Sequence, residues 1–242
     1  KFGEIMNKLI LMISVMLSFY TYAADHENEG TTDGAFTTLM IAASDVDKYI
    51  ETLKANTSAI EITGATDAGV CVTKSGHEYV GQMMVWSAFP SVEAALVGSL
   101  RYDATKPSRF SRLREVKYGT TWKPLKPFRL EPGYERVMRV NVPSANMASF
   151  VEAISELEKA IQAAGHKDFF NGVFAPIGGG SHEAQTLMVR SITKDASSTG
   201  KIFDEYFDGE SSWAEAYQNV LAQGGTVISD NFEECEQTYF SN

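Results

Sequence analysis

Hydrophobic and polar residues follow the same order in the two halves of the chain. The first half contains four strand-like runs, expected at residues 36–43, 69–73, 79–89 and 114–118. Apolar residues at helical spacing follow the first run, after the cap residue Ser44, and again after Pro90-Ser91. This half is therefore predicted to read strand, helix, strand, strand, helix, strand.

The second half repeats that order. Its strand-like runs are expected at residues 136–142, 169–177, 183–192 and 226–239. A helix is predicted from Pro143-Ser144 to the stop at Gly165, and a single long helix over 202–222. Each half contains a matching turn, Ser75-Gly76-His77-Glu78 in the first and Gly180-Ser181-His182-Glu183 in the second. Such an internal match indicates one supersecondary unit present twice.

The element order predicts an α+β fold of two fused ferredoxin-like (βαββαβ) repeats. Helices cover one face of each sheet, so the two bare apolar faces are expected to pack together as a barrel-like pseudo-dimer. We expect the first repeat at 35–122, a proline-rich linker at 123–133, and the second repeat at 134–242.

This arrangement resembles the dimeric α+β barrel superfamily, with both subunits fused in one chain. That group includes proteins similar to antibiotic-biosynthesis monooxygenases, haem-degrading monooxygenases and stress-responsive barrel proteins. The resemblance implies the barrel architecture and, as an alternative function, a cofactor-independent monooxygenase or isomerase. No catalytic motif of the family matches this sequence, so no site residue is carried over.

The chain has two cysteines, Cys71 and Cys235. An even count fits one disulfide in an oxidising compartment, and two separate buried thiols fit equally well. In barrels of the resembled family, the last strand of one unit lies beside the second strand of the other. The resemblance therefore implies a disulfide that joins the two halves.

Residues 6–24 have the pattern of a secretory signal peptide, with a basic start, an apolar stretch and small residues before a polar segment. An uncleaved membrane anchor is the alternative. We expect residues 1–24 to be removed, residues 25–34 to form a flexible leader, and the mature protein to be soluble and periplasmic or secreted, without stable membrane insertion.

The formal net charge is −10, which disfavours nucleic acid as a partner. Basic residues concentrate between Arg101 and Arg129, whereas no basic residue follows Lys201. These patches are expected to face each other across the two halves or across a homo-oligomer. The alternative is that the basic segment meets an anionic partner, such as a lipid surface or a polyanion.

Four residues are candidate ligand-binding residues: His77, Trp86, His182 and Arg190. A histidine beside a glutamate could transfer protons or ligate a metal, but neighbours on a strand face opposite ways, and polar residues are ordinary in turns. We therefore expect both His-Glu pairs to be ordinary polar residues of turns, and we expect no metal site. Gly178–Gly180 is expected to be a hairpin loop rather than a phosphate site.

Trp86 and the other strand aromatics are expected mainly in the core, with a pocket for an apolar ligand as the alternative. Arg190 interrupts an apolar strand, and reaching solvent is its default role, with an anionic ligand head as the alternative. Together these features predict a protein that binds a small, partly apolar ligand or serves as a protein-interaction module. No cofactor is expected.

Overall fold

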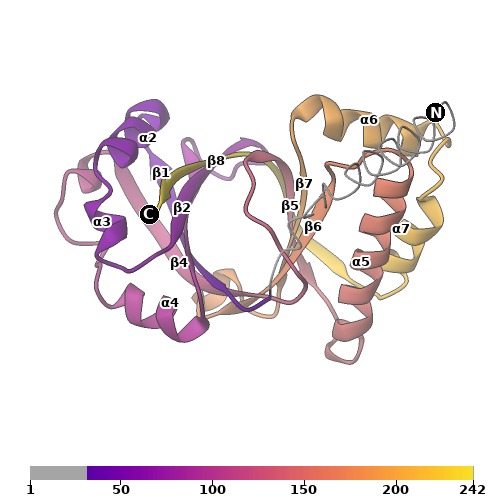
Figure 1. Cartoon of the computed structure of the whole chain (residues 1–242), viewed down its shortest axis with the longest axis horizontal. Coiled ribbons are helices and arrows are strands. Elements are labelled where there is room, and N and C mark those ends of the chain that lie inside the picture. Colours follow the sequence, from indigo (N-terminus) through magenta and orange to yellow (C-terminus); the bar gives the residue numbers. More distant parts are fainter. Residues whose placement is uncertain (1–31, 242) are drawn as a thin grey trace, which may run out of the picture.

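Eight antiparallel strands form one closed barrel with helices on two opposite sides (Figure 1). The computed structural model describes residues 32–241. The strand order around the barrel is β1-β3-β2-β8-β5-β7-β6-β4. The signal-peptide pattern at 1–24 and most of the expected leader lie outside the described residues.

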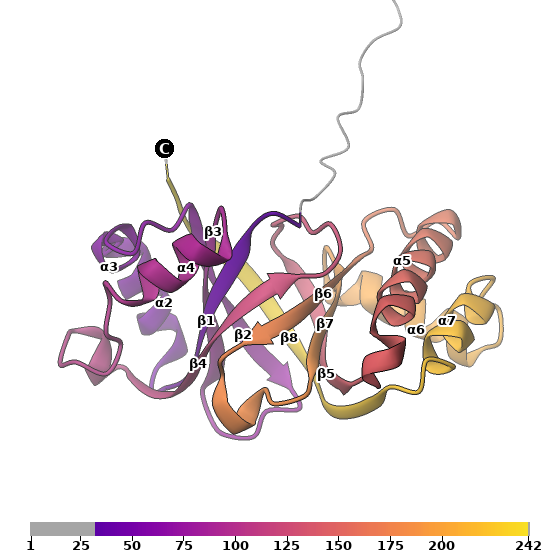
Figure 2. The same ribbon diagram turned by 90° about the horizontal axis from the view of Figure 1, so that it is seen from below.

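The first half supplies one side of the barrel and the helices beside it (Figure 2). It has the expected βαββαβ order, with a small extra helix α3 and a 3-10 turn η1. Its elements are β1 (Ala35–Ala43), α2 (Val46–Ala55), α3 (Ser58–Glu61), β2 (Asp67–Ser75), β3 (Gln82–Phe89), α4 (Val92–Ser99), η1 (Phe110–Arg112) and β4 (Arg114–Pro124).

The second half has the same order and supplies the other side. Its elements are β5 (Gly133–Asn141), η2 (Ser144–Asn146), α5 (Met147–Ala163), β6 (Phe170–Ile177), η3 (Gly180–His182), β7 (Leu187–Thr193), α6 (Ala196–Phe207), α7 (Ala214–Leu221) and β8 (Thr226–Phe240). The two-repeat architecture expected from the sequence is therefore confirmed.

Two strand pairs between the halves close the barrel. β2 pairs with β8, and β4 pairs with β6, so the second strand of each half meets the last strand of the other. Cys71 on β2 lies directly opposite Cys235 on β8. The two sulfur atoms form a disulfide, which joins the halves across this junction.

Each strand presents one face to the barrel interior and the other to the helices. On the helix side of the second half, a core forms between α5 and the sheet around Phe150, Ile154, Val173 and Val189. Separate cores form under α2 and under α4 in the first half. The barrel interior holds its own clusters, around Met84 and the disulfide and around Trp122 and Phe174.

The prediction of one long helix over 202–222 is wrong. The chain forms α6 and α7 there, and the break follows Phe207 at Gly209, which has a φ of 75°. Glycine adopts this left-handed conformation without the steric cost that other residues meet, so it ends the first helix. The apolar spacing continues across the break because both helices contribute side chains to the same core of the second half, Ile202 from α6 and Val220 from α7.

The ion pairs do not follow the expected pattern of charged patches. Within residues 32–241, no ion pair joins the basic segment 101–129 to the acidic residues after Lys201. Lys126 of the proline-rich segment instead pairs with Glu158 of α5 at 2.8 Å, and Glu236 pairs with Lys54 of α2 at 2.7 Å. In the same range, every helix is too short or too polar to cross a membrane.

Candidate functional site

The barrel interior holds a buried arginine between two glutamates. Arg190 on β7 is 4 % exposed. Its Nε lies 2.5 Å from Glu135 Oε2 on β5, and its Nη2 lies 2.7 Å from Glu233 Oε2 on β8. The expectation that Arg190 reaches solvent is therefore wrong, because strand alternation places residue 190 on the same inward face as Met188.

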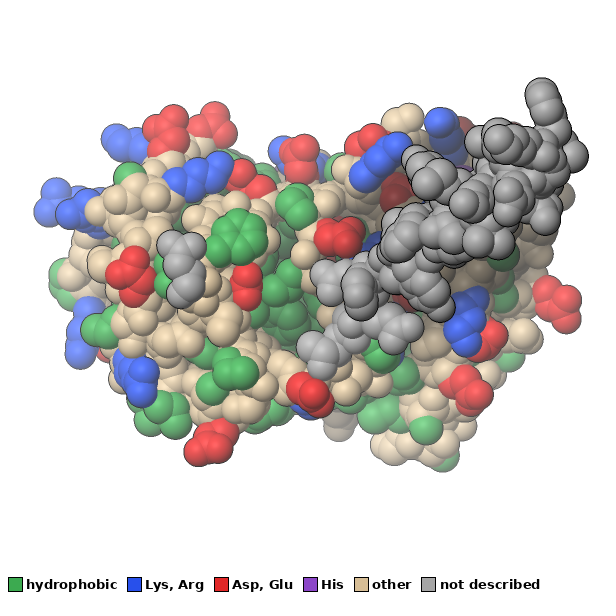
Figure 3. All heavy atoms as spheres, in the orientation of Figure 1, with side chains coloured by type: hydrophobic (Ala, Val, Ile, Leu, Met, Phe, Trp, Pro, Cys, Tyr) green, Lys and Arg blue, Asp and Glu red, His purple; other side chains and the backbone are tan. Residues whose placement is uncertain are grey.

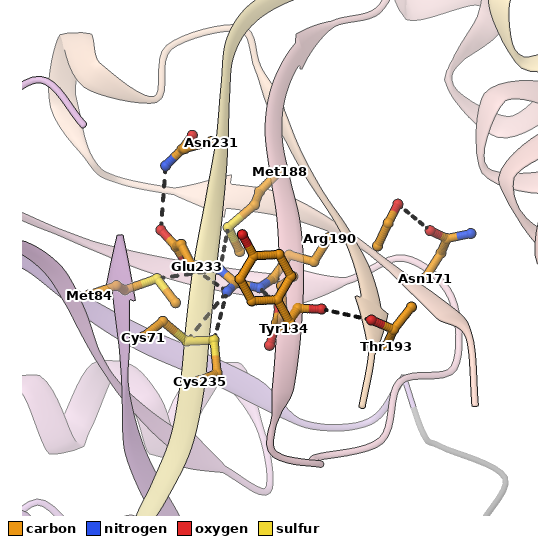
Figure 4. Close-up of polar contacts among 12 residues, drawn as sticks. Cys71, Met84, Tyr134, Asn171, Met188, Arg190, Thr193, Asn231, Glu233 and Cys235 are labelled. Atoms are coloured by element: carbon orange, nitrogen blue, oxygen red, sulfur yellow. Dashed lines mark hydrogen bonds and ion pairs between the residues drawn. A yellow bond between two sulfur atoms is a disulfide. The ribbon is translucent and has the colours of Figure 1, made fainter. Parts of the chain in front are cut away.

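Four sulfur atoms complete the surroundings of this guanidinium (Figure 4). Nη1 lies 3.7 Å from the sulfur atoms of Met84 and Met188, and Nη2 lies 3.4 and 3.3 Å from those of Cys71 and Cys235. Burial alone would lower the pKa of Arg190, but the two carboxylates raise it above its usual value. Each nitrogen of Arg190 has a protein partner, so this cluster holds the barrel together from within.

Trp86 and Arg190 both line a small cavity inside the barrel, which we call the barrel cavity. Hydrophobic side chains gather at the centre of the face that looks into the barrel (Figure 3). Phe36 packs edge to face on Phe128 and Phe174, with ring centroids 5.9 and 5.7 Å apart. These rings leave a cavity of about 50 Å³. That volume holds about four water molecules, and an organic ligand needs more space.

The second His-Glu pair belongs to a different polar cluster. Glu183 is 1 % exposed and accepts two bonds from Arg139 of β5, at 2.7 and 2.9 Å, and one from the Tyr118 hydroxyl at 2.8 Å. Burial and the Glu183 charge together raise the pKa of Tyr118. His182 is exposed and stacks on the Tyr118 ring, with centroids 4.2 Å apart. The expectation of an ordinary polar turn residue therefore holds for His182, and it is wrong for Glu183.

The first His-Glu pair has no such surroundings. His77 and Glu78 are exposed in the loop between β2 and β3, and this loop does not line the barrel cavity. The four candidate residues thus separate into three places, with only Trp86 and Arg190 together. Within the described residues, the one geometric cluster of metal-ligand type is Cys71, Glu233 and Cys235. Its two sulfur atoms are joined in the disulfide and offer no thiolate.

A larger cavity lies between the helices and the sheet of the second half. We call it the C-terminal cavity; its volume is about 220 Å³. Aliphatic and aromatic side chains form most of its wall, from α5 (Ile154, Leu157), from α6 and α7 and their connection (Phe203, Trp213, Val220) and from the sheet (Met138, Val189). Arg136 lines it as well, and this guanidinium forms a bidentate pair with Asp230 at 2.9 and 2.6 Å.

A third cavity occupies the corresponding place in the first half, between β1, β3, β4 and the helices. We call it the N-terminal cavity; its volume is about 330 Å³. Its wall mixes apolar side chains such as Leu39 and Phe110 with several hydroxyls, and it includes the buried Arg114.

Sequence reasoning missed both helix-side cavities. Helical spacing places Ile154 and Leu157 on a buried face, and it places Trp213 and Tyr217 on the final helix, but a buried face reads the same whether it packs against a sheet or lines a cavity. The break at Gly209 is the signal that could have helped, because two short helices joined by a loop pack less closely than one long helix.

The fold has counterparts among solved structures, all of them distant in sequence. A haem-binding protein from Thermus thermophilus is 15 % identical and has a TM-score of 0.50, with 87 % of this chain and 92 % of that chain covered. A protein assigned as a monooxygenase from Lactobacillus acidophilus NCFM is 12 % identical (TM-score 0.51; 87 % and 96 % covered). A mutant chlorite dismutase from Candidatus Nitrospira defluvii is 7 % identical (TM-score 0.50; 86 % and 92 % covered).

No family model and no curated protein matches the sequence. The structural similarity establishes the fold, whereas sequence identities this low leave the activity open. The chain therefore has the two-repeat ferredoxin-like barrel fold shared by chlorite dismutase-like and antibiotic-biosynthesis-monooxygenase-like proteins.

Proposed function

We propose that this protein binds a small, largely apolar ligand in the C-terminal cavity. The observation that carries the proposal is the composition of the wall: aliphatic and aromatic side chains surround about 220 Å³ of space in the core of the second half. Ligand sites commonly combine such an apolar wall with a few polar groups. The apolar side chains that line this space lack packing partners on one side, and an occupying ligand would supply those contacts.

Most polar groups in the wall already have protein partners, which favours an apolar ligand. The hydroxyls of Thr193 and Thr199 bond to each other at 2.7 Å, and Ser191 donates to Asn171 at 2.7 Å. The charge of Arg136 is balanced by Asp230. A ligand therefore gains little from hydrogen bonds here, and we expect burial of its apolar surface to supply most of the affinity.

Haem is the ligand named for one of the structural neighbours, so the wall has to be compared with what haem needs. Haem iron takes an axial imidazole, thiolate, thioether or phenolate. The lining residues of the C-terminal cavity include no histidine and no cysteine, although Met138, Tyr206 and Tyr217 offer a thioether and two phenols. His166, at the end of α5, bonds through Nε2 to Glu205 at 2.9 Å and is not one of the lining residues. The volume of about 220 Å³ is below the roughly 300 Å³ at which pockets for drug-sized ligands begin, and haem is larger than such ligands. The cavity thus does not fit haem, and we derive no step through it.

A cofactor-independent enzyme is the alternative, and the same wall argues against it. A general base needs a titratable group beside the reacting atom. The titratable lining residues of this cavity are Arg136, Tyr206 and Tyr217, and none of them carries a carboxylate or an imidazole. We therefore place binding ahead of catalysis.

A neutral fluorescent probe, N-phenyl-1-naphthylamine, tests the proposal. We expect its fluorescence to rise on binding at one site, and we expect Val220→Trp, which fills the C-terminal cavity, to weaken binding at least tenfold. Val80→Trp is the matched control because Val80 is 89 % exposed in the β2–β3 loop. Equal affinity in the wild type and Val220→Trp would refute the site. A one-to-one Soret shift on titration with haemin would refute the exclusion of haem.

We also propose that the protein is exported, as the signal-peptide pattern indicates. The Cys71–Cys235 disulfide supports this because such bonds persist in oxidising compartments. N-terminal sequencing of protein recovered from its native host tests it. A mature chain that begins near residue 25 is expected, and a chain that retains residues 6–24 in the cytoplasm would contradict it.

A further inference from the structure

Arg114 stands apart from the other buried cations of the structure. It is the first residue of β4, is 9 % exposed, and lines the N-terminal cavity. Its Nη1 donates to the Tyr49 hydroxyl at 2.5 Å, and its Nη2 donates to the Tyr102 hydroxyl at 3.0 Å and to the carbonyl of Ala104 at 3.4 Å. These acceptors are all neutral, so they orient the guanidinium without balancing its charge.

Within residues 32–241, no carboxylate forms an ion pair with Arg114, whereas the comparable buried cations all have one. Arg190 has Glu135 and Glu233, Lys126 has Glu158, and Arg139 has Glu183. Buried charges in proteins are ordinarily paired, because removing a lone charge from water is unfavourable. Arg114 therefore differs from the other buried cations of this protein in lacking a carboxylate partner.

The hydrogen bonds of Arg114 are also incomplete. A guanidinium has five N–H groups, and the Nε–H of Arg114 is buried with no partner in the described part of the chain. An unmet N–H on a buried cation that has no carboxylate partner marks a place where an acceptor is missing.

The rest of the cavity wall defines the kind of molecule that would supply that acceptor. The volume is about 330 Å³, and the lining includes Leu39, Val85, Phe89 and Phe110, with no carboxylate and no second cation. One positive charge balances a singly charged anion, while a phosphate monoester carries close to two charges at neutral pH. A wall of apolar side chains and neutral hydroxyls with one cation thus suits a monocarboxylate with a mainly hydrocarbon body.

We propose that the N-terminal cavity is a second ligand site, for a small organic acid whose carboxylate pairs with Arg114 and whose apolar body lies against β1 and β3. This site lies in the other half of the molecule from the C-terminal cavity and takes a different ligand class. Charge-assisted bonds from a guanidinium to a carboxylate are among the strongest in proteins, and Arg114 is only 9 % exposed.

Octanoate and 1-octanol are the probes, since they share a hydrocarbon chain and differ in charge. In the Val220→Trp variant, whose C-terminal cavity is filled, calorimetric titration is expected to show octanoate binding at least tenfold more tightly than 1-octanol. Arg114→Met should abolish that preference, and Arg114→Lys should retain part of it. Arg112→Met is the matched control, because Arg112 is exposed two residues away. Equal affinity for the two probes in Val220→Trp would overturn the proposal, as would an unchanged preference when Arg114→Met is added to that variant and the protein folds.

A measurement on the unaltered protein covers the case in which Arg114→Met does not fold. The Nε–H resonance of Arg114 is expected to shift on titration with octanoate and to stay in place with 1-octanol. An Nε–H resonance that does not move at saturating octanoate would overturn the proposal. Val220→Trp should leave the octanoate affinity unchanged, so failure of the C-terminal site and failure of this site are distinguishable.

Discussion

Cys71 and Cys235 lie directly opposite each other on β2 and β8, 164 residues apart in the chain, and their disulfide joins the first half to the second. A bond across so long a loop restricts the unfolded chain strongly, and native disulfides of this kind contribute about 2–5 kcal/mol. The bond also lies beside Arg190, whose Nη2 contacts both sulfur atoms.

The double substitution Cys71→Ala with Cys235→Ala is therefore expected to lower the free energy of unfolding by about 2–5 kcal/mol. Urea denaturation followed by circular dichroism measures it, with reduced wild type as a second comparison. Thiol counting in denaturant without reductant should give no free thiol. Two free thiols per exported chain would show that the bond does not form.

Removing the guanidinium from the barrel interior should be strongly destabilising. Arg190→Met leaves Glu135 and Glu233 buried without their partner, which is expected to cost about 3–5 kcal/mol. The triple variant with Glu135→Gln and Glu233→Gln removes the lone charges and should recover much of that loss. Urea midpoints compare the three proteins. A triple variant less stable than Arg190→Met would contradict the ion-pair account.

Alkaline pH should destabilise the protein through its buried phenols. Burial, with the charges of Glu78 and Glu115, raises the pKa of Tyr79 from 10.0 to about 12. A raised folded-state pKa means that this stabilisation is complete below pH 10 and is lost as the pH rises from about 10 to 12. The free energy of unfolding should fall more steeply over this window in the wild type than in Tyr79→Phe. Parallel curves for the two proteins would contradict this.

Two helix glycines should respond to alanine in opposite directions. A Cβ at Gly98 of α4 would lie 2.7 Å from a Phe89 ring carbon and from the Thr63 carbonyl, so Gly98→Ala should cost about 1–3 kcal/mol. A Cβ at Gly200 of α6 meets nothing within 4 Å, so Gly200→Ala should stabilise by about 0.5–1 kcal/mol. Thermal unfolding of both variants gives the comparison, and a stabilised Gly98→Ala would refute the tight packing of α4.

The strand and helix order of both repeats could be predicted because apolar periodicity reports which face of an element is buried. Periodicity does not report what lies on the buried side. From the sequence, Arg190 is therefore predicted to lie at the surface. In the structure it lies inside the barrel, where it forms ion pairs with two glutamates that are distant in the chain. Glu183 reads as a turn residue for the same reason, since Arg139 and Tyr118, which hold it, come from other strands.

The cavities are harder still to predict. Arg114 is one of nine basic residues from Arg101 to Arg129. Nothing in the sequence indicates that Arg114 is the one among them that is buried without a carboxylate partner among the described residues. That distinction depends on which carboxylates the fold brings near each cation. It appears only when all contacts of the side chain are known.

The pairing of β2 with β8 has a consequence for how the chain is made. During synthesis the first half emerges with the edge of β2 bare, and its partner β8, residues 226–240, is the last strand of the barrel to be made. A bare edge can recruit the equivalent strand of another molecule. Exchange of the C-terminal strand between two copies is thus the characteristic assembly error expected of this architecture, and slow translation of the second half should increase it.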